Sequence, residues 1–432
     1  MKKTTGCLNL LALLLIPAVY VAAQDDPKQR VKYVRELGKG GSEAIPKLEP
    51  YLADPVTEVR LQTVKSIVEI GTQRSLDALI KATSDNDAEV QIHATDGLVN
   101  FYVPGYIRTG ITGSMQRLGT SIKSRFTDTN DQVVDAYVHP RPEVVRALGR
   151  VASSGASMDA RAGAARGVGI LRGREAVADL EKALQSKNSD VIYESLVALQ
   201  KIRDPNAGPA IMFLFRDLDE RVQVAAIETT GLLVNRGAIN DLRDILDRSK
   251  KIKVKRAALT SLAQMPEEQL HGVYKTYLDN KDEGLREAAA EGLGRLKNPA
   301  DLPTVETAFG IEKKIGPRIS LAFAIVALGK RDMGEFDPLR YLVNNLNSNV
   351  YRAVARPYLM ELARDPEVRR ALYPVLQESN ATKDEKVGLA LVFAASGERD
   401  SIGPLEALSR DPDGEVSQEG LRALKNLHTR VP

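Results

Sequence analysis

The chain has 432 residues, of which 60 are Lys or Arg and 57 are Asp or Glu, with 43% hydrophobic residues, 5% aromatic residues and no Trp. This near-neutral charge gives no electrostatic case for nucleic-acid binding, which needs a clustered positive surface. Cys7 is the only cysteine. A mature chain that lacks Cys7 therefore has no thiol for a disulfide, a thiolate metal site or a nucleophile.

Residues 1–23 predict an export signal. Lys2 and Lys3 give a charged start, a mostly apolar run follows, and small residues precede an expected cleavage near Ala23. The run is short for a membrane span and is interrupted by Pro17, which disfavours an uncleaved anchor. Lipidation at Cys7 is disfavoured because this cysteine precedes the apolar run. We expect an exported protein, periplasmic or secreted, with 60 − 2 = 58 basic residues after cleavage.

A unit of two helices repeats through the chain after residue 24 and is clearest at 217–247. In its first helix, Val222, Ala226 and Thr230 share one face, and the small Ala226 lets a neighbouring helix approach closely. A small residue recurs at this position every ~31 residues, which predicts an all-α solenoid of about eleven two-helix repeats. The corresponding positions are Thr63, Ala94, Ala164, Ser195, Ala258, Ala289 and Ala324.

The step from Ala94 to Ala164 is longer than one period by an insertion of roughly 39 residues, because the period stops after Phe101 and resumes at Arg141. A helix with Val144, Leu148 and Val151 on one face then supplies the second half of the interrupted third repeat. Asp54-Pro55 suits the first turn of a helix. We divide the mature chain into N-terminal repeats (24–101), an insertion (102–140), regular repeats (141–309), and looser repeats with a cap (310–432).

In the looser part, Val350 is expected to open another unit, and Pro357 is expected to kink its first helix. Val416 to Leu427 is expected to end the array as a single helix. This final unit is incomplete and polar and is therefore interpreted as a cap.

The insertion is the first candidate for partner binding. Its apolar residues between Ile107 and Phe126 recur at spacings of three and four, which predicts an amphipathic helix. The span has basic residues and no acidic ones, so it suits an anionic membrane surface or a groove on a partner. Three glycines weaken an isolated helix, and the alternative is that the segment folds back onto the solenoid. The candidate residues are Tyr102, Tyr106, Arg108, Arg117, Lys123, Arg125 and Phe126.

A second candidate is a basic stretch between two regular repeats. Positive charge at a helix N-terminus opposes the helix dipole, so this stretch is not explained by helix stability. It suits an anionic partner, but its lysines could instead pair with Asp244, Asp247 or acids of the next repeat. The residues are Lys250, Lys251, Lys253 and Lys255.

No residue pattern supports catalysis or a cofactor. Glu89, His93 and Asp96 share a helical stripe that could hold a divalent ion, but a paired, solvated face is the favoured interpretation. His271 and the remaining histidines have no evident catalytic partner in the sequence. The glycines around Lys39 follow no strand and are interpreted as a helix stop and turn. We therefore expect a non-enzymatic protein with no metal and no cofactor.

The repeats resemble HEAT repeats, most closely the short bacterial kind similar to phycobilisome-lyase repeats. The likeness is carried by Asp-x-x-x-x-Val-Arg at 54–60 and by Leu-Gly helix endings such as Leu37-Gly38, Leu293-Gly294 and Leu328-Gly329. This resemblance implies a right-handed superhelix whose inner surface, lined by the second helices, binds other macromolecules.

The resemblance also bears on enzymatic function. Hydroxylases of this architecture bind iron through His-Glu pairs, and no His here is followed by Glu. A bilin-lyase-like enzyme remains an alternative that fits an export signal poorly. We therefore expect an exported scaffold for proteins, with a peripheral membrane adaptor that uses 107–126 as the alternative.

Overall fold

The computed structural model describes residues 26–106 and 132–431, and every regular element in these ranges is a helix. The contacts divide the chain into two compact units: Met1–Val134 with Pro140–Ile202, and Asp135–His139 with Arg203–Pro432. Long helices alternate with shorter ones in chain order, and the described residues give eleven such pairs followed by one last helix. The predicted all-α repeat architecture is therefore confirmed.

The first unit contains the interrupted third repeat. Its α-helices are α2 (Pro27–Gly38), α3 (Ile45–Leu48), α4 (Thr57–Ile70), α5 (Ser75–Ala82), α6 (Ala88–Tyr102), α9 (Pro142–Ser154), α10 (Met158–Ile170), α11 (Val177–Ala183) and α12 (Ser189–Ile202). Short 3₁₀ helices lie at η2 (Gly41–Ala44), η3 (Glu49–Ala53) and η4 (Arg174–Ala176). The long helices α2, α4, α6, α10 and α12 form one row in which each contacts the next.

The second unit continues the alternation of long and short helices. Its α-helices are α13 (Glu220–Leu232), α14 (Ile239–Arg248), α15 (Ile252–Ala263), α16 (His271–Tyr277), α17 (Glu283–Leu296), α18 (Leu302–Ile311), α19 (Ile315–Ala327), α20 (Pro338–Asn344), α21 (Arg352–Leu362), α22 (Pro366–Leu372), α23 (Lys383–Ser396), α24 (Ile402–Leu408) and α25 (Gly414–Arg430). Its 3₁₀ helices are η5 (Pro205–Ala207), η6 (Pro209–Arg216), η7 (Arg236–Ala238), η8 (Glu268–Leu270), η9 (Pro299–Asp301), η10 (Asn345–Asn347), η11 (Tyr373–Leu376) and η12 (Arg399–Ser401).

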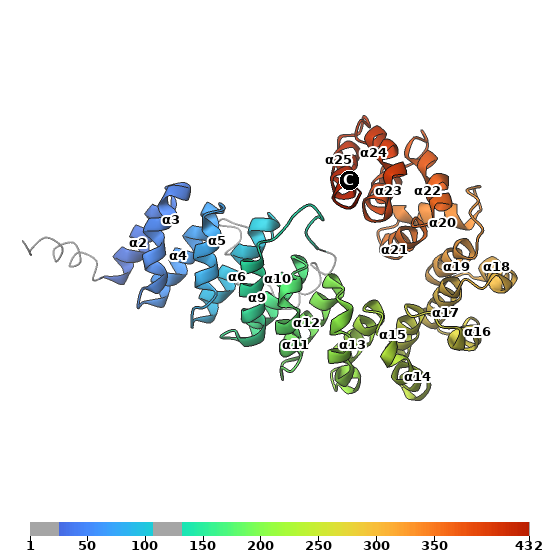
Figure 1. The fold of residues 1–432 in the computed structure, drawn as a ribbon, viewed down its shortest axis with the longest axis horizontal. Coiled ribbons are helices and arrows are strands. Elements are labelled where there is room, and N and C mark those ends of the chain that lie inside the picture. Colours follow the sequence, from blue (N-terminus) through green and yellow to red (C-terminus); the bar gives the residue numbers. More distant parts are fainter. Residues whose placement is uncertain (1–25, 107–131, 432) are drawn as a thin grey trace, which may run out of the picture. The chain divides into compact units, whose positions relative to one another are not determined.

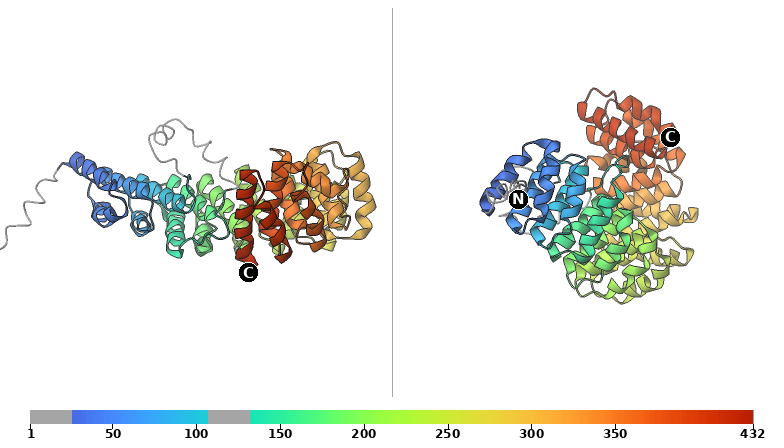
Figure 2. Two further views of the ribbon diagram at one scale, coloured as in Figure 1. Left: turned by 90° about the horizontal axis from the view of Figure 1, so that it is seen from above. Right: turned by 60° about the vertical axis from the view of Figure 1, so that its left-hand side comes forward.

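The two rows of the second unit differ from the expectation about the inner surface. The long helices from α13 to α25 contact one another in succession. Within this unit, they follow the inner side of an arc, and α14, α16 and α18 lie further out (Figures 1 and 2). The first helices of the repeats, not the second, line the inner side of this unit. The expectation was wrong because the sequence alone does not show which of the two alternating rows of helices lies on the inner side of the curve.

Small residues at one position of the long helices hold the rows together. All eight positions of the predicted column, from Thr63 to Ala324, are fully buried. The structure also explains why glycines follow this column in three repeats. A Cβ at Gly169, Gly231 or Gly294 would lie 2.6–2.7 Å from a backbone Cα of the next long helix. These glycines therefore allow the backbones of consecutive repeats to approach closely.

Ion pairs between consecutive repeats form a second device, which explains the Asp-x-x-x-x-Val-Arg motif. Asp54 accepts a hydrogen bond from the Val56 N–H and pairs with Arg30 of α2, the preceding long helix. Arg60 donates to the backbone oxygen of Asp54 at 3.0 Å and reaches Asp85 of the next repeat at 2.7 Å. The same arrangement recurs at Arg286 with Glu312 and, without the backbone bond, at Lys386 with Asp411. We call these contacts cross-repeat pairs.

Two helix starts differ from the sequence expectation. The helix after Asp54-Pro55 begins only at Thr57, because Asp54 caps the preceding turn instead of the helix itself. Val350 does not open a buried face: it is 72% exposed, and Ala355 and Leu359 occupy the inward positions of α21. Helix α21 runs through Pro357.

The two residues that flank the insertion are in direct contact. The Tyr102 hydroxyl accepts a hydrogen bond from the Arg141 backbone N–H at 3.0 Å, which joins the two ends of the insertion. Arg141 also donates to Asp77 of α5 at 2.8 Å. Helix α9 then packs between α5 and α11 in the second row. The prediction that the insertion separates the two helices of one repeat is confirmed.

Candidate functional site at the ends of α17, α19 and α21

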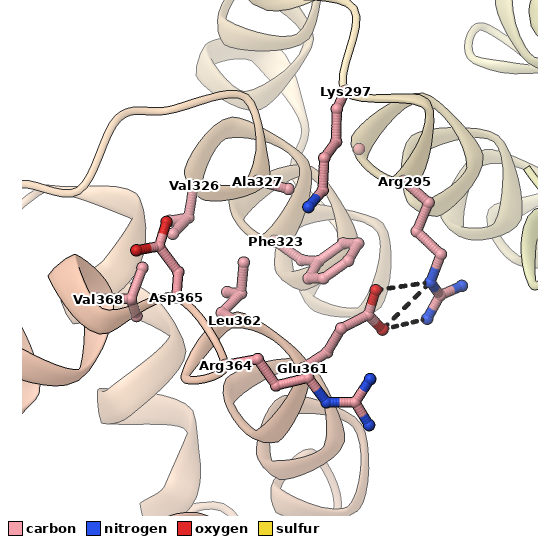
Figure 3. A pocket seen from close by; sticks show the side chains of 11 residues that line it. Arg295, Lys297, Phe323, Val326, Ala327, Glu361, Leu362, Arg364, Asp365 and Val368 are labelled. Carbon is pink, nitrogen blue, oxygen red and sulfur yellow. Dashed lines mark hydrogen bonds and ion pairs between the residues drawn. The ribbon is translucent and has the colours of Figure 1, made fainter. Parts of the chain in front are cut away.

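A pocket in the second unit lies where the C-terminal ends of three consecutive long helices meet (Figure 3). Its volume is about 430 Å³, within the range of ~300–1,000 Å³ that is usual for ligand pockets. Apolar side chains of α19, α21 and α22 form the floor, and charged side chains surround it. The lining residues are Gly294, Arg295, Lys297, Phe323, Val326, Ala327, Glu361, Leu362, Arg364, Asp365 and Val368.

Arg295 of α17 forms the centre of the charged wall. Its Nε lies 2.9 Å from Oε1 of Glu361, and its Nη2 lies 2.8 Å from Oε2, so the two groups pair through two nitrogens. The other guanidinium nitrogen bonds Glu291, which also accepts from Gln264 at 2.8 Å. Burial opposes the charge of Arg295, but the two carboxylates outweigh it and the pKa of Arg295 is raised. Arg295 is therefore a fixed positive charge that connects α15, α17 and α21.

Two stacked aromatic rings lie next to the Arg295 side chain. The rings of Phe323 and Tyr358 are stacked with centroids 4.4 Å apart, and the Arg295 guanidinium lies 5.4 Å from the Phe323 centroid. The Tyr358 and Ser320 hydroxyls are 3.0 Å apart. Burial raises the pKa of Tyr358, so this phenol stays neutral and serves as a hydrogen-bonding group. The floor of the pocket is thus rigid, because each large side chain has a defined neighbour.

The anions of the pocket are paired, whereas two of its cations make no ion pair within 4 Å to a described residue. Burial tends to raise the pKa of Asp365, but the Glu367 N–H, Arg331 and the charge of Lys297 lower it below its usual value. The Arg331 guanidinium lies 2.7 Å from Asp365. Lys297 and Arg364 are exposed and make no ion pair with any residue in 26–106 or 132–431. Figure 3 shows them on opposite sides of Phe323 and Glu361.

The pocket was not found by the sequence analysis. Glu287, Glu291 and Arg295 recur every four residues on α17, which places them on one face. From the sequence alone, such a pattern is typical of the solvated face of a helix. In the structure, Glu291 is only 6% exposed. The sequence does show Arg295 four residues after Glu291, which indicates an ion pair within the helix. Its second partner, Glu361, belongs to a later repeat and cannot be identified from the local sequence.

We expect Glu287→Gln to raise the unfolding midpoint at neutral pH. Burial, then the nearby Glu283, raises the pKa of Glu287 above 4.5, and a Cβ at Gly316 would overlap its carboxylate. A raised folded-state pKa gives stability that is present below pH 4.5 and lost as the pH rises through the folded-state value. Glutamine removes this loss, so the difference from the original chain should disappear on acidification. Thermal unfolding at a series of pH values measures this difference.

Glu43→Gln is the matched control, because the Glu43 carboxylate is 81% exposed and burial cannot disfavour its charge. A gain from Glu287→Gln that persists unchanged below pH 4 would contradict the assignment.

The predicted insertion residues fall in two groups. Arg108, Arg117, Lys123, Arg125 and Phe126 lie outside the described residues. Tyr102 lies at the start of the insertion and accepts the hydrogen bond from the Arg141 N–H that is described above. Tyr106 lies beside Arg166, and burial followed by the Asp96 charge raises its pKa. Arg166 pairs in turn with Glu194 at 3.1 Å.

The basic stretch before α15 is at the helix start, as expected. Lys251 and Lys253 lie 3.8 and 3.7 Å from Glu220, an acid of the preceding repeat, and Lys255 donates to the Asp247 backbone oxygen at 3.4 Å. Arg248 pairs with Asp244 at 2.7 Å. Lys250 is exposed. The structure therefore separates these lysines from the pocket, and their role in partner binding stays a prediction.

The histidines differ in their surroundings. The Nδ1 atom of His93 lies 2.9 Å from the Glu89 backbone oxygen, within its own helix. His271 does have a partner: its Nε2 lies 2.8 Å from Oδ2 of the buried Asp301 in the next repeat. Across 26–106 and 132–431, no three side chains of His, Cys, Asp or Glu gather as metal ligands would. In the same ranges, no helix combines the length and apolar character of a membrane span.

Comparison with known protein families identifies the type of repeat. A family model for HEAT repeats matches residues 16–99 and 239–314. The chain therefore contains HEAT repeats in both regions, and the second region includes the α17 side of the pocket. No curated protein sequence matches the chain.

Solved structures give only loose similarity. The CpcE–CpcF complex of phycocyanin lyase from Nostoc is 17% identical, with a TM-score of 0.37, over 62% of this chain and 92% of that chain. Human deoxyhypusine hydroxylase is 17% identical, with a TM-score of 0.29, over 66% of this chain and 96% of that chain. Importin beta is 14% identical, with a TM-score of 0.38, over 95% of this chain and 58% of that chain. These values do not indicate a function.

Proposed function

We propose that this chain is an exported, non-enzymatic scaffold that binds other proteins through its solenoid surface. The supporting observation is that three consecutive repeats of the second unit together build one pocket with an apolar floor and a charged rim. Such a combination is typical of surfaces that bind a partner, because the apolar part supplies affinity and the charges supply orientation. The insertion at 102–140 is proposed as a second binding element.

Chemical crosslinking in the cell envelope tests this function. The mature chain is tagged at its C-terminus, crosslinked and purified, and the captured proteins are identified and then bound again as purified proteins. We expect at least one partner that binds the mature chain directly. The original chain is compared with a variant in which 107–131 is replaced by a short Gly-Ser linker, which keeps the hydrogen bond between Tyr102 and Arg141.

The comparison distinguishes the two binding elements. Loss of a partner from the linker variant, with unchanged thermal unfolding, assigns recognition to the insertion. Retention assigns recognition to the repeats, and Lys250→Glu and Lys251→Glu are the next variants. The absence of any partner that binds again as a purified protein would contradict the scaffold proposal. The mass of the purified chain tests export separately, since cleavage after Ala23 leaves Gln24 as the first residue.

A further inference from the structure

The segment 135–139 belongs by its contacts to the second unit, although it precedes α9 in the sequence. It lies against α25, the last helix of this unit. The Asp135 carboxylate pairs with the Arg422 guanidinium, and its Oδ1 lies 2.9 Å from both Nε and Nη2. The Ala136 N–H donates to Oδ1 of Asn426 at 2.8 Å. These contacts join positions 287 and 290 residues apart, so the fold creates them and the local sequence does not.

An aromatic side chain completes the contact. The Tyr137 hydroxyl donates to Oδ2 of Asp135 at 3.1 Å, and the Lys425 ammonium lies 5.1 Å from the centroid of the Tyr137 ring, as in a cation–π contact. Burial tends to raise the pKa of Asp135, but Arg422, Asn426 and Tyr137 outweigh burial and lower it, so this carboxylate stays charged. We call the contact of 135–137 with α25 the clasp.

The clasp consists of groups that remain in contact with water. The Asp135 and Arg422 side chains are 21% and 48% exposed, and Ala136 and Tyr137 are exposed as well. No residue of 135–139 is buried. Exposed ion pairs and cation–π contacts each contribute little stability, and salt screens the interaction between their charges. The clasp is therefore a weak contact that depends on ionic strength.

Helix α25 itself is held by packing that does not involve the clasp. Its Val416, Ala423 and Leu427 are almost completely buried and belong to the hydrophobic core of this unit. The helix contacts α23 and α24. This packing comes from the burial of apolar surface, which charge screening does not weaken. The clasp can therefore open while α25 stays folded.

We propose that the clasp is a reversible, salt-sensitive switch that covers one face of α25. In the closed state, 135–137 occupies Arg422, Lys425 and Asn426. In the open state, these three groups are free to bind other ligands. The clasp thus adds regulation to the proposed scaffold function and rests on that function only in this respect, because its opening requires no partner.

Hydrogen exchange of the Ala136 amide measures the clasp directly, because the acceptor of its hydrogen bond belongs to α25. Exchange is resolved to single amides by mass spectrometry of the mature chain, at low and at near-molar NaCl. A synthetic peptide of residues 132–139 gives the unprotected rate in each buffer. We expect protection at low salt that falls in high salt, and at least about fivefold faster exchange in Arg422→Ala. The amides of α25 should stay protected throughout.

Two variants separate the clasp from general effects of charge. Arg410→Ala removes an exposed arginine of the same unit outside the clasp, and it should leave the exchange of the Ala136 amide unchanged. The double variant Asp135→Arg with Arg422→Asp reverses the ion pair. It should restore part of the protection that each single variant loses, which a merely local disturbance of α25 would not do.

Three outcomes would overturn the inference. If the Ala136 amide exchanges at the rate of the free peptide in low salt, the clasp does not form. If its protection is indifferent to salt and to Arg422→Ala, the contact is a fixed part of the fold and not a switch. If the amides of α25 lose protection together with it, the helix unfolds instead of the clasp opening. None of these outcomes bears on the scaffold proposal, which the crosslinking experiment tests independently.

Discussion

Replacing Arg295 with alanine is expected to lower the free energy of unfolding by about 3–5 kcal/mol, the range for removing one partner of a buried ion pair. Glu291 is almost fully buried and would lose its cation, keeping the neutral hydrogen bonds from Gln264 and Tyr358. Burial already raises the pKa of Glu291 despite the lowering effect of Arg295, so removal of the guanidinium leaves an unfavourable buried carboxylate. Urea unfolding followed by circular dichroism measures the loss.

Arg331→Ala is the matched control for this variant. Arg331 also bridges repeats, but its side chain is 34% exposed, and pairs in contact with solvent contribute at most about 1 kcal/mol. The double variant Arg295→Met with Glu291→Leu removes both charges and fills similar volume, so it should recover much of the loss. If Arg295→Ala costs no more than Arg331→Ala, the wall of the pocket does not depend on Arg295.

The second large effect is expected from two glycines of one helix. In α10, a Cβ at Gly169 would lie 2.7 Å from the Cα of Ala198, whereas a Cβ at Gly163 would have no atom within 4 Å. Gly169→Ala forces α10 and α12 apart and should destabilise the chain by about 1–3 kcal/mol, the usual cost of overpacking. Gly163→Ala meets no such contact and should stabilise the helix by roughly 0.5–1 kcal/mol.

The opposite signs make this pair a strict test of close helix packing. Both variants replace Gly with Ala in the same helix, so differences in composition and helix propensity cancel. The unfolding midpoints of the two variants and the original chain are compared under identical conditions. Stabilisation by both substitutions would show that α10 and α12 can separate at little cost, which would contradict the structural explanation of the glycine.

The sequence predicted the repeats well because each repeat reports the same constraint. A small residue must occupy the contact between long helices, and this requirement leaves a visible column from Thr63 to Ala324. Hydrophobic spacing also located α9 correctly beyond the insertion. Helix α4 begins at Thr57, later than expected from Asp54-Pro55, because the Asp54 carboxylate accepts a hydrogen bond within the preceding turn and also forms a cross-repeat pair. Local capping rules cannot distinguish these roles.

The pocket could not be predicted, because its residues come from three consecutive repeats and are brought together only by the fold. Arg295 and Glu361 are 66 positions apart. Each is an unremarkable charged residue of an amphipathic helix until the curvature of the second unit brings the helices together. The pairing of Arg331 with Asp365 is likewise a property of the fold, since the sequence does not show which cations have acidic partners.

The cross-repeat pairs also have a consequence for how such a chain can change in length. Each of these repeats carries an acidic group at its start, and its long helix carries a cation that reaches forward, as Asp54 and Arg60 do. A duplicated copy of such a repeat would therefore arrive with a contact for the unit before it and another for the unit after it. Because repeats in a solenoid contact only their neighbours, an added unit needs no change elsewhere. The same contact that stabilises the array thus makes its growth by duplication compatible with folding.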